Sequence, residues 1–265
     1  MSDPAARIAE LEKQVADLSS QLMQAQKLAS VGTLATAITH EFNNILTTTI
    51  NYAKMGVRHQ DAPTRDKAFE KILAASQRAA KITTSLLSYA RHKPNRVDVV
   101  NLSVIVGDLL VLVEKDLMRY RVQLETHLAD NIFAEINASQ IQQVLMNLVI
   151  NARQAIKERG QVTVTVSKSS DNKWAEIAVK DTGCGIPKEV IPKIFQNFYT
   201  TKTADEQGQG GTGIGLALCK DIIETHKGRI RVESTPNVGT TFTLKLPLVK
   251  QAGLVKSKEP QLVNS

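Results

Sequence analysis

The feature that most constrains this fold is an amino-terminal stretch in which apolar residues recur at alternating spacings of three and four. Over residues 5–28 these positions are Ile8, Leu11, Val15, Leu18, Leu22 and Ala25. Such a repeat predicts a coiled coil, most simply a parallel dimer. The alternative is one surface helix on a globular domain, but a strict repeat of about 3.5 residues drifts around a lone helix of about 3.6 residues per turn. We therefore expect residues 1–29 to form a coiled-coil helix.

The helical pattern continues without proline as far as Pro63. A polar break covers residues 58–64, where Asp61 or Thr64 can cap a second helix and Pro63 suits its first turn. That second helix is expected to end near residue 92, just before Pro94. The sequence therefore predicts a helical hairpin over 30–95, and two copies would form a dimeric four-helix bundle.

Shorter segments of both kinds follow Pro94. Strands are expected at 97–100, 122–128, 132–136, 161–167, 174–180, 229–234 and 240–246, and helices at 102–118, 138–159 and 214–226. This mixture of antiparallel strands and separate helices predicts an α+β multidomain chain whose second half, residues 96–250, is an α/β sandwich. Residues 251–265 are polar and are expected to be a disordered tail.

Charge and composition narrow the function classes. The 265 residues carry a net charge of +7, but their 33 Lys and Arg are scattered, so we expect no direct nucleic-acid binding and consider an acidic partner instead. Cys184 and Cys219 are too far apart for a zinc site and fit a reducing compartment. No apolar run reaches the ~18–20 residues that cross a bilayer. We therefore expect a cytoplasmic chain with no transmembrane segment.

Two motifs in the second domain carry polar chemistry. Asn147 and Asn151 are four residues apart and project from one face of the expected helix 138–159. Paired amide oxygens suit Mg²⁺ beside phosphate oxygens, although such a pair is also typical of solvated amides. Asp181 ends a strand and begins the sequence Asp-Thr-Gly-Cys-Gly-Ile-Pro over 181–187. There a carboxylate can accept a hydrogen bond from an exocyclic amine and glycines let the backbone pass close to a planar base, but an ordinary turn looks the same.

A glycine-rich loop over residues 208–216 opens the last helix and offers backbone N–H groups to phosphates. It lacks the Lys and Ser/Thr ending of a P-loop, and no βαβ unit surrounds it. Together with the aromatic segment 194–199 and the sequence Gly-Thr-Thr-Phe at 239–242, these motifs, in this order, resemble the Bergerat-type ATP-binding domain of sensor histidine kinases. The hairpin around His40 resembles the dimerisation and phosphoacceptor domain of that family.

The resemblance implies that the cofactors are ATP and Mg²⁺ and assigns roles within the site. Asn151, assisted by Asn147, would ligate Mg²⁺, and Asp181 would bind the adenine amine with Thr241 nearby. Residues 199–210 would form a mobile lid over ATP. The other residues implied to contact the nucleotide are Gly183, Gly185, Ile186, Phe198, Tyr199, Lys202, Gly211, Thr212, Gly213, Ile214, Gly215 and Leu216.

The implied phosphoacceptor is His40, which taken alone is typical of an ordinary helix histidine. A neutral imidazole nitrogen is a competent nucleophile for phosphorus. Glu41 is long enough to orient the Nδ1 proton of His40, so that Nε2 attacks. Asn44 lies one turn later on the same face, where the family has an amide or hydroxyl that positions water for dephosphorylating the partner.

Two hypotheses follow. The first is a homodimeric, bifunctional protein histidine kinase and phosphatase of two-component signal transduction. It would phosphorylate His40, pass the phosphoryl group to an aspartate of a response-regulator receiver domain, and answer to an upstream sensor domain or protein. The regulator would dock near Thr48, Tyr52, Leu86 and Tyr89. The rival is a nucleotide-switched coiled-coil clamp that closes on ATP without modifying histidine.

Overall fold

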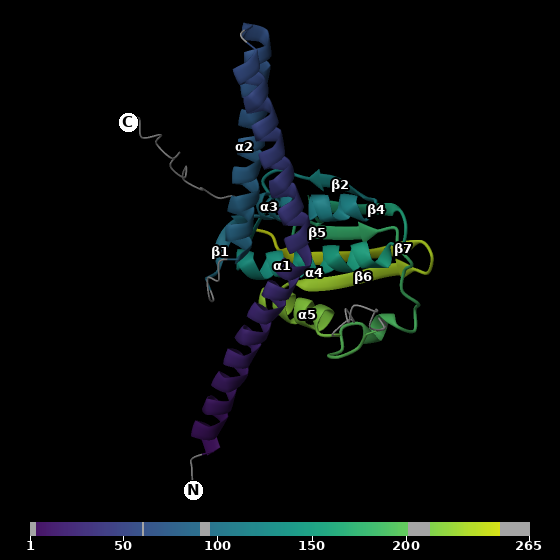
Figure 1. Ribbon diagram of the computed structural model, residues 1–265. Helices are drawn as coiled ribbons and strands as arrows, with labels where there is room; N and C mark the ends of the chain where they lie inside the picture. The colour runs from purple at the N-terminus through teal and green to yellow at the C-terminus, as the bar shows by residue number, and fades with distance from the viewer. Residues whose placement is uncertain (1–3, 60, 91–95, 201–212, 250–265) are drawn as a thin grey trace.

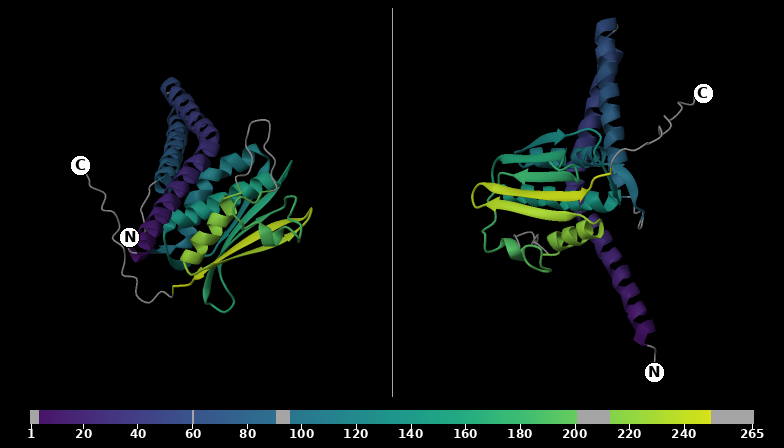
Figure 2. Two further views of the ribbon diagram at one scale, coloured as in Figure 1. Left: turned by 90° about the horizontal axis from the view of Figure 1, so that it is seen from below. Right: turned by 180° about the vertical axis from the view of Figure 1, so that it is seen from behind.

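The computed structural model describes residues 4–59, 61–90, 96–200 and 213–249. These residues form three layers, which are clearest when the molecule is seen from below (Figure 2, left). A helical hairpin is the first layer, three helices are the second, and a β-sheet is the third. The amino-terminal part of the first helix projects beyond the other layers (Figure 1).

The hairpin consists of α1 (Pro4–Arg58) and α2 (Ala62–Ala90). The backbone N–H of Thr64 donates to Oδ1 of Asp61 at 2.9 Å, so Asp61, one of the two expected candidates, caps α2. The expected coiled coil and the first hairpin helix are one continuous helix. Tyr89, expected on a docking surface, is only 1% exposed, and Leu86 packs against the core beside it. That part of the expected surface is therefore covered in this arrangement.

The main sheet has the strand order β2-β4-β5-β7-β6. Its strands are β2 (Val122–Leu128), β4 (Gly160–Lys168), β5 (Trp174–Asp181), β6 (Arg229–Thr235) and β7 (Gly239–Pro247). The β2–β4 pair is parallel and the other pairs are antiparallel. A separate two-stranded sheet joins β1 (Asp98–Asn101) to β3 (Phe133–Ile136). The parallel pair was not expected, and it follows from the crossover through α4 between β2 and β4.

The middle layer consists of α3 (Leu102–Arg119), α4 (Ala138–Ala155) and α5 (Gly215–Thr225), which cover one face of the sheet. A short 3₁₀ helix, Ile191–Lys193, precedes the last of these. Alternate strand residues such as Val162, Val164 and Ile177 are at most 1% exposed and face these helices. The α/β domain therefore has a continuous apolar core.

A buried ion pair fastens α3 to α4. Nη1 of Arg153 lies 3.2 Å from Oδ2 of Asp116, and its guanidinium stacks 4.2 Å from the ring centroid of Tyr120. Burial raises the pKa of Asp116, and the positive charge of Arg153 lowers it by less. The pair fixes the two helices next to each other, because an unpaired charge at this depth would be costly.

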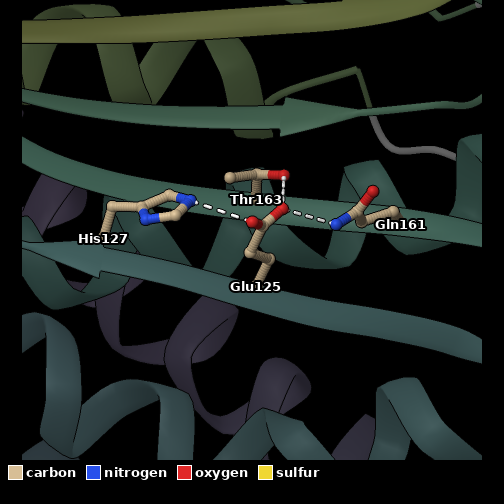
Figure 3. A network of polar contacts seen from close by, with 4 residues as sticks. All are labelled: Glu125, His127, Gln161 and Thr163. Atoms are coloured by element: carbon tan, nitrogen blue, oxygen red, sulfur yellow. Dashed lines mark hydrogen bonds and ion pairs between the residues drawn. The ribbon is translucent and has the colours of Figure 1, made fainter.

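The outer face of the sheet is polar. There the carboxylate of Glu125 contacts Nε2 of His127 at 3.0 Å and also accepts hydrogen bonds from Gln161 and Thr163 (Figure 3). These contacts join the edge strand β2 to β4 through side chains as well as backbone. His127 therefore has a structural partner on the outer face of the sheet.

The predicted fold class is confirmed: a helical hairpin is followed by an α/β domain. The largest error in the element bounds concerns α4, which was expected to reach residue 159 and ends at Ala155. Ile156 takes an extended conformation and is 7% exposed, because its side chain enters the core. Tertiary packing thus overrides the good helix formers that follow it.

Candidate nucleotide site

A cavity of ≈ 500 Å³ lies between α4, α5 and the ends of β5 and β7. This volume falls within the range of small-molecule pockets, about 300–1,000 Å³. Nine of the expected site residues line it: Asn147, Asn151, Asp181, Gly185, Ile186, Tyr199, Gly213, Gly215 and Leu216. The fold therefore gathers four separate sequence motifs around one hollow.

Asp181 is the buried acid of the cavity, with 4% of its surface exposed. Its Oδ1 accepts the backbone N–H of Gly183 at 2.8 Å and that of Thr240 at 3.3 Å. Burial raises the pKa of this carboxyl, and the two backbone donors oppose that rise. With one oxygen held by the backbone, the other is available to an amine donor on a planar base.

Asn147 and Asn151 face the cavity from α4, where they sit one turn apart. Among the described residues, no cluster of three or more His, Cys, Asp or Glu side chains is placed to hold a metal ion. Two amide oxygens alone hold Mg²⁺ poorly, but they fit an ion that keeps water and phosphate oxygens as its other ligands. The donor set therefore suits a metal that arrives with a nucleotide.

Two glycines show why this loop-and-helix region tolerates no side chains. Gly185 has φ +69°, a left-handed conformation, and a Cβ there would collide with the backbone of Thr235. Gly215 begins α5, and a Cβ on it would lie 2.8 Å from both amide atoms of Asn147. The cavity wall is thus formed by backbone at these points.

The structure corrects the expected role of Thr241. Thr240 lines the cavity and is 4% exposed, whereas Thr241 pairs with Lys180 and points to the opposite face of the sheet. Successive strand residues alternate between faces, so a shift of one residue moves the hydroxyl from the cavity to solvent. Thr240, not Thr241, is the threonine beside Asp181.

Several other expected contacts are displaced or lie outside the described residues. Phe198 is 77% exposed and does not line the cavity, and Ile214 precedes α5 as its N-cap. Gly183 contributes through its bond to Asp181. Lys202, Gly211, Thr212 and nearly all of the expected lid lie outside the described residues.

Sequence reasoning missed the apolar wall of the cavity. Its members are Ile150, Ala152, Ala155, Val190, Ile194 and Phe242, and Gln154 and Thr200 add polar surface. Two signals were present. Helical spacing puts residue 150 and residues 154–155 on the stripe of the two asparagines, and strand alternation puts Phe242 on the face of Thr240. An apolar wall with a few placed polar groups is typical of a small-molecule site.

His40 and Asn44 stand one turn apart on the exposed side of α1, whereas Glu41 turns inward and is 7% exposed. Oε1 of Glu41 lies 2.6 Å from Nε of Arg78 on α2, and Oε2 lies 3.8 Å from Nζ of Lys115 on α3. Arg78 also approaches Glu114 of α3 at 3.9 Å. We call these four side chains the interlayer ion network. Contrary to expectation, Glu41 is engaged there and not with the imidazole of His40.

Two protein families match the chain in order. Residues 30–95 match the His Kinase A (phospho-acceptor) domain. Residues 136–250 match the family described as Histidine kinase-, DNA gyrase B-, and HSP90-like ATPase. None of the helices that the structure describes combines the length and the apolar character that a bilayer crossing requires.

Curated relatives are sensor kinases. The chain is 36% identical over 233 residues to the signal transduction histidine-protein kinase AtoS of Escherichia coli (strain K12), covering 87% of this chain and 37% of AtoS. It is 33% identical over 242 residues to the sensor protein FixL of Bradyrhizobium diazoefficiens, covering 87% of this chain and 46% of FixL. The chain thus spans less than half the length of these relatives.

Solved structures agree. The catalytic domain of the histidine kinase ThkA matches at 32% identity and a TM-score of 0.50, over 57% of this chain and 95% of that domain. ThkA in complex with the response regulator protein TrrA matches at 25% identity and a TM-score of 0.50, over 85% of this chain and 64% of that one. Because the phosphoacceptor and ATPase families match in this order, and the ThkA catalytic domain is covered almost entirely, the protein belongs to the sensor histidine kinases of two-component systems.

Proposed function

We propose that this protein transfers the γ-phosphoryl group of ATP to His40 and then to an aspartate of a response-regulator receiver domain. The observation that carries the proposal is the cavity in which Asp181, Asn147, Asn151 and backbone from the glycine-rich segment converge, on the same chain as an exposed helical histidine.

The cavity residues divide the work of holding ATP. Asp181 accepts the adenine amine while the apolar wall covers the base, and Asn151 with Asn147 holds Mg²⁺ beside the phosphates. Mg²⁺, when bound, neutralises charge on the phosphate oxygens. The backbone at Gly213 and Gly215 lines the cavity and donates to the same phosphates. This division matches phosphoryl transfer, which asks the protein mainly for positioning and charge neutralisation.

His40 supplies the nucleophile. Every described residue that lines the cavity belongs to the α/β domain and His40 lies on α1, so the proposed transfer brings the nucleotide to a histidine outside the cavity lining. The attacking Nε2 and the phosphorus must come within about 3–3.5 Å. Glu41 can orient the Nδ1 proton only after it leaves Arg78 and Lys115. Opening of the interlayer ion network therefore belongs to the proposed reaction.

The remaining parts of the proposal concern partners. Exposed apolar residues on α1, including Ile8, Val15 and Leu18, support a homodimer through a coiled coil over 1–29 and a bundle over 30–95. The solved ThkA–TrrA complex supports a receiver domain as phosphate acceptor. Asn44, exposed one turn after His40, is proposed to position water for dephosphorylating that regulator. An upstream sensor domain or protein would supply the stimulus.

Incubation with γ-labelled ATP and Mg²⁺ tests the kinase reaction. We expect an acid-labile label on the wild-type protein and none on His40→Gln. His127→Gln, which alters the structural histidine on the outer sheet face, is the matched control and should label normally. If the wild type binds ATP but acquires no label, the kinase proposal fails and the nucleotide-switched clamp is favoured.

The phosphatase activity needs a separate assay. Asn44→Ala should autophosphorylate at the wild-type rate but slow the loss of phosphate from a phosphorylated receiver domain. The measurement is the decay of labelled regulator with and without each kinase variant. Equal decay with wild type and Asn44→Ala would remove the phosphatase role from this residue.

A further inference from the structure

Cys219 is a buried thiol on α5 that contacts one of the two cavity asparagines. It is 2% exposed, and its Sγ accepts a hydrogen bond from Nδ2 of Asn147 at 3.1 Å. Its own S–H is directed to the carbonyl of Val144 on α4, 3.9 Å away. Because its S–H proton is directed to the carbonyl of Val144, the sulfur of Cys219 accepts the hydrogen bond from Asn147.

Cys219 binds one end of the Asn147 amide, and this decides which amide atom remains to contact a ligand. A side-chain amide has a donor nitrogen and an acceptor oxygen, and only the oxygen can ligate a cation. With Nδ2 turned to the thiol, Oδ1 is the end left for the cavity that Asn147 lines.

Gly215 leaves room for the end of the same amide. The position of a Cβ on Gly215 would be 2.8 Å from Nδ2 and 2.8 Å from Oδ1 but 3.1 Å from Cγ, so the end of the Asn147 amide faces this glycine. A second contact joins the two helices farther along, where the backbone N–H of Asn137 donates to Nε2 of His226 at 2.9 Å. The amide of Asn147 therefore ends against the backbone of Gly215, and its nitrogen is bound by sulfur.

We propose that Cys219 is a positioning residue: it binds the nitrogen of Asn147 and so presents the oxygen to the Mg²⁺ that accompanies the nucleotide. The inference rests on the proposed function and deepens it. Without the thiol, the amide can rotate and turn a donor toward the cation. Losing one neutral hydrogen bond of this kind corresponds to roughly a three- to tenfold change in an equilibrium.

The test compares Cys219→Ser, which keeps an acceptor, with Cys219→Val, which keeps apolar volume and removes it. Affinity for ADP is measured with Mg²⁺ and with EDTA. We expect the gain in ADP affinity caused by Mg²⁺ to be about three- to tenfold smaller in Cys219→Val than in the wild type. In EDTA the two proteins should bind ADP with equal affinity. Cys219→Ser should retain the gain. Ile223→Val, a buried change on α5 away from the cavity lining, is the packing control and should also retain it.

Hydrogen exchange of the Asn147 Nδ2 protons, followed by NMR and assigned from their absence in Asn147→Asp, is the direct readout. Exchange should be slow in the wild type and Cys219→Ser and fast in Cys219→Val. Slow exchange in Cys219→Val, or equal losses of affinity with and without Mg²⁺, would overturn the inference. If His40 fails to acquire label, the proposed kinase function fails separately, and the exchange rates still decide whether Cys219 holds the amide.

Discussion

Replacing Asp181 by Asn separates nucleotide recognition from fold stability. Asparagine keeps a carbonyl oxygen for the backbone N–H groups of Gly183 and Thr240, now 2.8 and 3.3 Å from Oδ1. It replaces the other carboxylate oxygen by an NH₂ group, which would face the donor amine of adenine. The change is therefore nearly isosteric for the fold and unfavourable for the ligand.

The expected loss of affinity can be worked from the bond removed. A hydrogen bond to a charged group contributes about 1.5–3 kcal/mol, which corresponds to roughly 10- to 150-fold in a dissociation constant. Two donors facing each other add to this loss, so the upper part of the range is expected. Titration with ADP measures it directly.

The effect on stability has the opposite sign. Burial raises the pKa of Asp181 above its ordinary value of 3.8. Its contribution to stability is thus fully present below the unfolded-state pKa and is lost as the pH rises through the folded-state pKa. Above that window, Asp181→Asn should be at least as stable as the wild type. The free energy of unfolding in urea, measured from acidic to neutral pH, should show the difference growing in favour of the variant.

Asp171→Asn is the matched control. Asp171 is exposed, and hydrogen bonds from Ser169 and from the backbone of Lys173 lower its pKa. Its contribution is present above the unfolded-state pKa and lost as pH falls, so the pH trend should reverse and ADP binding should not change. Two results would refute this reasoning: wild-type ADP affinity in Asp181→Asn, or a large loss of stability at neutral pH.

Three further predictions concern contacts around this site. Lys115→Gln removes one cation of the interlayer ion network. Because partly exposed ion pairs contribute about 0–1 kcal/mol, the initial rate of autophosphorylation should rise by up to about fivefold at unchanged ADP affinity. An unchanged or slower rate contradicts this prediction. His226→Phe leaves the N–H of Asn137 without its acceptor and should lower the free energy of unfolding in urea by about 1–3 kcal/mol; wild-type stability would show that another group replaces the ring. Gly215→Ala should fold but displace the amide of Asn147. Calorimetric titration should then show Mg²⁺-dependent ADP binding weakened by about tenfold or more. Unaltered binding would contradict the close approach of Gly215 to this amide.

Local patterns predicted most of the fold because they depend on near neighbours. The strands and helices of the α/β domain follow from alternation and helical spacing, and the cavity motifs follow from residue type and order. The choice between two adjacent threonines was also decidable: Phe242 is buried, so alternation puts Thr240 on its side of the sheet. The Gly-Thr-Thr-Phe motif at 239–242, used without this alternation, had led us to expect Thr241 beside Asp181.

Long-range features carried no comparable signal. The parallel pairing of β2 with β4 depends on how α4 crosses the sheet, and β2 would show the same alternation beside another partner. Glu41, Arg78 and Lys115 come from three helices, so neither spacing nor charge pattern indicated that they meet. Glu41 was therefore assigned to its sequence neighbour, whereas the packed layers bring it two cations.

The uninterrupted course of α1 through Gly32 to His40 has a geometric consequence. An α-helix turns by about 100° and rises about 1.5 Å per residue, so the length of this segment sets an angle as well as a distance. One residue inserted between residues 30 and 37 would rotate the amino-terminal end of α1, and any domain or protein bound to it, by about 100° about the helix axis relative to the imidazole of His40. Seven residues would restore the direction almost completely while adding about 10 Å. The output of such insertions should therefore follow helical phase, with activity recurring at whole heptads and not declining steadily with length.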